Sequence, residues 1–245
     1  AMCFLGTLVC AYRAPKAGDT HQEVLEMFHD TELFGVVGIL VSILLSEGRR
    51  EKGAKLPQTV ISICVQAVRI LNHIARIDLQ TVQKTLGASR QQEFYHLLVS
   101  LLDYCVGRLP ASMVKPGPSG QAEESDLLHE AVVLLGFYCL QEPANQSILC
   151  YGEGQALLAR LASLPLYYFM DERGKSILFP TILASCFKSE QNLEVLRSEM
   201  NMSLVRSYLA SQMKGGEEVP GTFPSFSSRF PPELWEEAIA FFDAN

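Results

Sequence analysis

The chain has 245 residues, of which 48% are hydrophobic and only 19% charged, and its formal net charge is −7. This length is enough for a substantial core, in one large domain or in one array of repeats. The acidic balance argues against general binding to phosphate backbones, so we expect no DNA binding, although a local basic patch could contact RNA.

The cysteines and the longest apolar run indicate a chain without disulfides or a membrane span. Seven cysteines, an odd number, lie mostly in apolar stretches, and no C-x-x-C occurs, which is typical of buried thiols in a reducing compartment. The longest uncharged run, residues 33–46, has 14 residues, whereas a transmembrane helix needs about 20. The first residues, AMCFLGTLVCAY, lack the basic flank of a signal peptide and read as part of a helix. We therefore expect a piece of a longer protein.

Helical periodicity dominates, and the first clear helix is predicted over residues 56–77. Its polar side chains recur every three or four positions, which leaves one narrow polar stripe on a helix packed between neighbours. These residues are Ser62, Gln66, Arg69, His73 and Arg76. Asp78 is expected to cap a short helix that ends near Gly87, and a further helix is expected to end near Gly107.

Residues 110–124 are rich in proline, glycine and serine and are predicted to form a mobile loop. We expect Asp171 to cap a later apolar helix, in which Pro180 should cause a kink or mark a boundary. The other helices are predicted near residues 125–141, 143–151, 154–164, 189–198 and 201–214.

The C-terminal part has two predicted pieces. Residues 215–230 read as a linker arm whose phenylalanines should hold it against the body of the protein. Residues 231–245 form the last helix, which places Trp235, Ile239 and Phe242 on one face. We expect this helix to dock through Trp235.

An internal repeat appears when VVLLGFYCLQEPANQSIL is laid over FPTILASCFKSEQNLEVL, 47 residues further on, so that Asn145 meets Asn192. Both copies read as an apolar helix, a polar turn and two more helices, and a weaker copy begins at Val65. A period of about 40–47 residues is typical of armadillo and HEAT repeats. We predict an all-α, armadillo/HEAT-like helical-repeat solenoid over residues 1–214, closed by the docked C-terminal helix.

The polar turns are interpreted as corners between stacked helices. Helix ends leave backbone N–H and C=O groups without helical partners, and the side chains of Asn145 and Asn192 can supply those partners. A direct ligand role for the two asparagines is the alternative. If the chain is cytosolic, the triplet Asn145-Gln146-Ser147 is not glycosylated.

No catalytic or metal-binding motif stands out. No two of the five histidines are four residues apart, and neither H-E-x-x-H, G-x-S-x-G nor a P-loop occurs. We therefore expect no enzyme activity, no metal and no cofactor, although a site assembled in space from distant residues stays open.

A basic cluster, RREKGAK, offers one candidate contact surface. Arg49, Arg50, Lys52 and Lys55 stand beside a single acid in an otherwise acidic chain. A solvated turn is one interpretation, and a contact to RNA phosphates or to an acidic partner is the other.

Two single arginines are further candidates for a partner or RNA contact. Arg160 and Arg206 lie near the later helices of the two clear repeats and could project from a groove.

Three stretches carry a family resemblance: LLHEAVVLLGFYCLQEPANQSIL, SLPLYYFMDERGKSILFPTILASCFKSEQN and the terminal RFPPELWEEAIAFF. With AMCFLGTLVC, TELFGVVGILVSILL and ISICVQAVRILNHIARIDL, they resemble the C-terminal region of the SCAPER family, the S-phase cyclin A-associated proteins in the endoplasmic reticulum. The similarity spans nearly the whole chain, and its least matched parts are residues 49–56, 110–124 and 215–228. The sequence ends in DAN, without the lysine-rich tail of vertebrate members.

This resemblance implies a non-catalytic adaptor in the cytoplasm and on the cytosolic face of the endoplasmic reticulum, while a nuclear location stays open. In tubulin autoregulation, the family links a tetratricopeptide protein that recognises nascent tubulin to the CCR4–NOT deadenylase at ribosomes, so that tubulin mRNA decays. The C-terminal region is the part implied to dock on that factor and the ribosome, with a local contact to ribosomal RNA. The alternatives are a cyclin A-associated cell-cycle scaffold at the endoplasmic reticulum and a membrane-surface scaffold.

Overall fold

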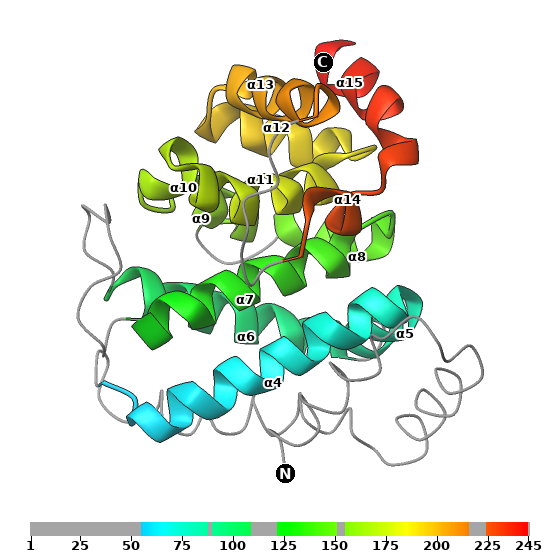
Figure 1. The fold of residues 1–245 in the computed structure, drawn as a ribbon. Coiled ribbons are helices and arrows are strands. Elements are labelled where there is room, and N and C mark those ends of the chain that lie inside the picture. Colours follow the sequence, from blue (N-terminus) through cyan, green and yellow to red (C-terminus); the bar gives the residue numbers. More distant parts are fainter. Residues whose placement is uncertain (1–54, 88–89, 109–121, 151–154, 216–223, 245) are drawn as a thin grey trace. The chain divides into compact units, whose positions relative to one another are not determined.

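A computed structural model describes residues 55–87, 90–108, 122–150, 155–215 and 224–244 of the chain. Within these ranges the regular structure is helical and no strand occurs (Figure 1). The prediction of an all-α protein is therefore confirmed for the described residues. The chain divides into two compact units, and in its described part the first unit extends to Leu134 and the second begins at Leu135.

The first unit contains α4 (Gln58–Ile77), α5 (Leu79–Leu86), α6 (Gln91–Val106) and the residues up to Leu134 of α7 (Ala122–Cys139). The polar stripe predicted on α4 is confirmed, because all five of its side chains are half-exposed between buried apolar rows. Asp78 caps α5 as expected. The Asp78 carboxylate accepts hydrogen bonds from the Thr81 backbone N–H at 3.0 Å and from the Thr81 hydroxyl at 2.6 Å.

A partly buried ionic network joins α4 to α7 within this unit. The Arg69 Nε–H donates to Glu130 Oε1 at 2.7 Å, and Nη2 donates to Asp126 Oδ2 at 3.0 Å. Asn72 Nδ2 donates to Glu130 Oε2 at 2.8 Å and to its backbone oxygen at 3.0 Å. Burial raises the pKa of Glu130, while the hydrogen bonds from Arg69 and Asn72 act in the opposite direction.

Helix α7 begins at Ala122, three residues before the start expected from the sequence. Glu123 and Glu124 lie in its first turn, where carboxylates interact favourably with the positive end of the helix dipole. The end of the loop predicted over residues 110–124 is therefore helical, and residues 109–121 lie outside the described part.

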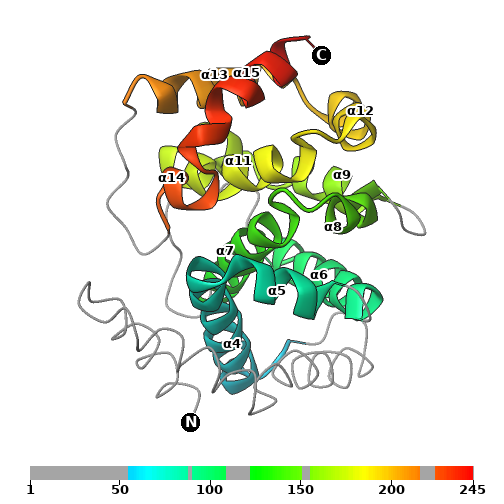
Figure 2. The same cartoon turned by 90° about the vertical axis from the view of Figure 1, so that its right-hand side faces the viewer.

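The second unit is a succession of short and long helices (Figure 2). After the last residues of α7 come α8 (Pro143–Ser147), the 3₁₀ turn η2 (Ile148–Cys150), α9 (Leu157–Ala162), α10 (Tyr167–Met170), α11 (Glu172–Cys186), α12 (Glu190–Glu199), α13 (Met202–Met213), α14 (Phe226–Arg229), η3 (Pro232–Leu234) and α15 (Trp235–Ala244). Asp171 caps α11 as predicted, because Oδ1 accepts from the N–H groups of Arg173 and Gly174 at 2.9 and 3.2 Å.

Helix α11 continues through Pro180, so of the two alternatives expected for this proline, a kink or a boundary, the boundary is wrong. Proline has no N–H, and the carbonyl of Ser176, four residues earlier, loses its helical donor. Arg229 replaces that donor from α14: Nη1 donates to Ser176 O at 2.7 Å, and Nη2 donates to Ile177 O at 2.8 Å. Nη2 also donates to the Thr181 hydroxyl at 2.6 Å. The arginine, only 2% exposed, thus stabilises the turn that the proline interrupts.

Aromatic rings hold the described part of the C-terminal arm against α11 and α13. Phe226 packs edge-on against Tyr208, with ring centres 5.6 Å apart, and Phe230 packs edge-on against Phe187 at 5.7 Å. Tyr208 in turn stacks on Phe179 of α11 at 4.9 Å. Phe226 and Phe230 are buried, so this segment belongs to the core of the second unit.

The C-terminal helix α15 lies beside α13 (Figure 2). Its most buried residues are Ala238 and Phe242, 0% and 1% exposed. Trp235 is only half-buried: its indole N–H donates to Phe230 O at 2.9 Å, and its ring lies 5.1 Å from that of Phe226. The tryptophan therefore contacts the arm, while Phe242 fills the core.

The described cysteines are free thiols, and all but Cys150 are buried. Burial raises the pKa of Cys64 to about 11 and of Cys105 and Cys139 to about 12. The folded chain keeps these protons where the unfolded chain, with thiol pKa values near 9.0, loses them. Their contribution to stability is therefore present below about pH 9 and is lost as the pH rises through 11 to 12.

Replacing Arg229 by alanine should lower the free energy of unfolding by about 3–5 kcal/mol, because three buried acceptors lose a charged donor. Urea unfolding followed by circular dichroism measures this. In that background, Pro180→Ala should restore about 1 kcal/mol, since the new N–H can donate to Ser176 O. The exposed Arg197→Ala is the matched control and should change stability by less than about 0.5 kcal/mol. A loss that small for Arg229→Ala would contradict the role assigned to this side chain.

At pH 8, iodoacetamide should modify Cys150 at least about tenfold faster than the other described cysteines, Cys64, Cys105, Cys139 and Cys186, because burial removes both access and thiolate. Peptide-level mass spectrometry of the native protein measures these rates. Equal rates in the native state would show that the helices open readily, and unfolding in guanidinium should make the rates equal.

Candidate functional site

Two helix corners of the second unit have the same backbone conformation. Gln141 and Lys188, 47 residues apart, follow the ends of α7 and α11 with positive φ values of 54° and 63°. The next residues cap α8 and α12 with nearly equal angles: φ −121° and ψ 90° at Glu142, φ −120° and ψ 96° at Ser189. The chain therefore turns in the same way at both ends of this interval.

The two asparagines occupy matching places in these corners. Asn145 Nδ2 donates to Tyr138 O at 2.9 Å, and Asn192 Nδ2 donates to Ser185 O at 2.7 Å. Each bond thus reaches a carbonyl seven residues earlier, near the end of the preceding helix. Both asparagines are buried, at 3% and 0% exposure, where an unpaired carbonyl would be costly.

Gln146 connects one corner to the other, a role that the sequence analysis did not assign. Its amide nitrogen donates to Ala184 O at 2.8 Å and to Phe187 O at 3.0 Å, both near the end of α11. In return, Asn192 Nδ2 donates to Gln146 O at 3.0 Å, and the Cys150 thiol donates to Asn192 Oδ1. The amide groups of Asn192 and Gln146 are therefore used inside the protein to fix neighbouring helices.

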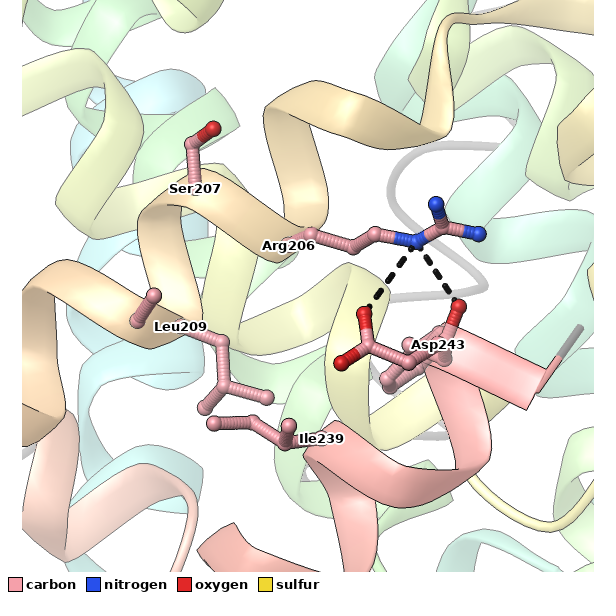
Figure 3. A pocket seen from close by; sticks show the side chains of 7 residues that line it. Arg206, Ser207, Leu209, Ile239 and Asp243 are labelled. Carbon is pink, nitrogen blue, oxygen red and sulfur yellow. Dashed lines mark hydrogen bonds and ion pairs between the residues drawn. The ribbon is translucent and has the colours of Figure 1, made fainter.

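A pocket of about 240 Å³ lies between α13 and α15 and includes Arg206 (Figure 3). Its apolar part is formed by Leu209, Ala210, Ile239 and Phe242, and Ser207 and Asp243 complete the lining. The Leu209 and Ile239 side chains face each other across the two helices. Arg206 extends toward the end of α15, where its Nε–H donates to Phe242 O at 2.8 Å and lies 3.7 Å from Asp243 Oδ1.

The other candidate contact residues are placed differently. Arg160 lies in α9, half-exposed, and its Nε–H donates to Gln155 O at 3.2 Å. Lys55, in the first unit, has a side chain 59% exposed and lies 3.9 Å from Glu124 Oε1. Arg49, Arg50 and Lys52 lie outside the described residues. In the described part, Lys55 thus belongs to the first unit, and Arg160 and Arg206 lie on different helices of the second.

The described part of the chain contains no group of three or more histidine, cysteine or acidic side chains arranged to hold a metal ion. His129, 4% exposed, lies 3.4 Å from the Ser125 hydroxyl one turn earlier on α7.

One described helix, α4, is long and apolar enough to cross a membrane by length and composition. Its buried residues and the ion pairs that Arg69 makes with α7 favour a core helix of the first unit instead. The apolar run at residues 33–46 lies outside the described residues.

These features define a class, an all-helical protein whose buried amides fix helix corners and whose described pocket lies between two helices. No family model matches the sequence. The chain is similar to the human protein named S phase cyclin A-associated protein in the endoplasmic reticulum, with 29% identity over 231 residues. The match covers 86% of this chain and 16% of the length of that relative. It confirms the expected resemblance to the SCAPER family, and the relative's name is not that of an enzyme.

Asn192→Ala should lower the free energy of unfolding by about 2–4 kcal/mol, because the carbonyls of Ser185 and Gln146 lose their buried donor. Asn145→Ala, which removes one such bond, should cost about 1–3 kcal/mol. Denaturant unfolding measures both values. Gln191→Ala, an exposed neighbour on α12, should change stability by less than about 0.5 kcal/mol. Equal effects of Asn192→Ala and Gln191→Ala would contradict the interpretation of the corner.

Proposed function

We propose that the chain is a non-catalytic protein-interaction scaffold, built as an armadillo/HEAT-like solenoid. The observation that carries the proposal is the corner repeated after 47 residues, with the same positive φ, the same cap angles and the same asparagine bond. A helical unit of this period exposes one face to partners and stacks the other on its neighbours. The buried amides are used to hold neighbouring helices together, which suits a scaffold that binds partners through its outer surface.

Cyclin A is the first partner to test, because the human relative is named for its association with cyclin A. The name of that relative also supports a location at the endoplasmic reticulum, and for this chain we propose the cytosolic face and the surrounding cytoplasm. Since the chain corresponds to 16% of the relative's length, cyclin A binding by these residues is part of the proposal.

A more specific form of the proposal follows from the family resemblance. In this form the chain docks on ribosomes that translate tubulin and on a tetratricopeptide protein that recognises nascent tubulin, so that the CCR4–NOT deadenylase, recruited through other regions, degrades the mRNA. The basic residues Arg49, Arg50, Lys52 and Lys55 would then contact ribosomal RNA. A membrane-surface scaffold is a third form, which flotation of the purified chain with liposomes would test.

Capture experiments with the purified chain test the scaffold proposal. Immobilised chain should retain purified cyclin A, or soluble chain should co-sediment with ribosomes that carry nascent tubulin. The bound amount should fall at least about fivefold when Arg160 and Arg206 are both changed to glutamate. Arg197→Glu, at another exposed position, is the matched control and should bind like the original chain. If neither partner is retained, both specific forms of the proposal fail.

A further inference from the structure

We draw no further inference here: the strongest candidate, the surface patch formed by the exposed apolar side chains of Leu166 and Met170 at the two ends of α10, carries none because nothing in the structure shows what covers it.

Discussion

The second unit depends on donors supplied to buried carbonyl groups where its helices bend. When an apolar helix ends inside the protein, water cannot satisfy its last carbonyls. Asn145 and Asn192 each donate a hydrogen bond to a carbonyl seven residues earlier. Gln146 donates to two carbonyls of the neighbouring corner. An unpaired carbonyl costs about 1–3 kcal/mol, which is large compared with the stability of a typical domain. These amides therefore fix where the chain turns.

Arg229 obeys the same constraint at a longer distance along the chain. Pro180 removes one donor from α11, and an arginine 53 residues from the acceptor Ser176 supplies the replacement. The bonds also bring α14 onto α11, so that Phe226 and Phe230 can pack beside Tyr208 and Phe187. The carbonyl of Ser176 that Pro180 leaves without a helical donor is therefore the group that binds Arg229 and so holds the arm on α11.

The sequence predicted what is determined locally. The polar stripe of α4, the caps Asp78 and Asp171 and the placement of Asn145 and Asn192 in helix corners all follow from spacings of a few residues. Long-range contacts were missed because periodicity carries no information about them. Neither the arginine opposite Pro180 nor the Gln146 bridge to α11 has a local signal. For the candidate site, Arg206 could be named from its charge, whereas its pairing with the end of α15 depends on how two distant helices pack.

The Asn145 side chain has a consequence for where this polypeptide can mature. A sugar would attach to Nδ2, the atom that donates to Tyr138 O, in a residue only 3% exposed. An oligosaccharide added there during translocation would leave no room for the bend and would take its donor. Glycosylation at this position and folding of the second unit therefore exclude each other: a chain that carries a sugar on Asn145 cannot form the native corner.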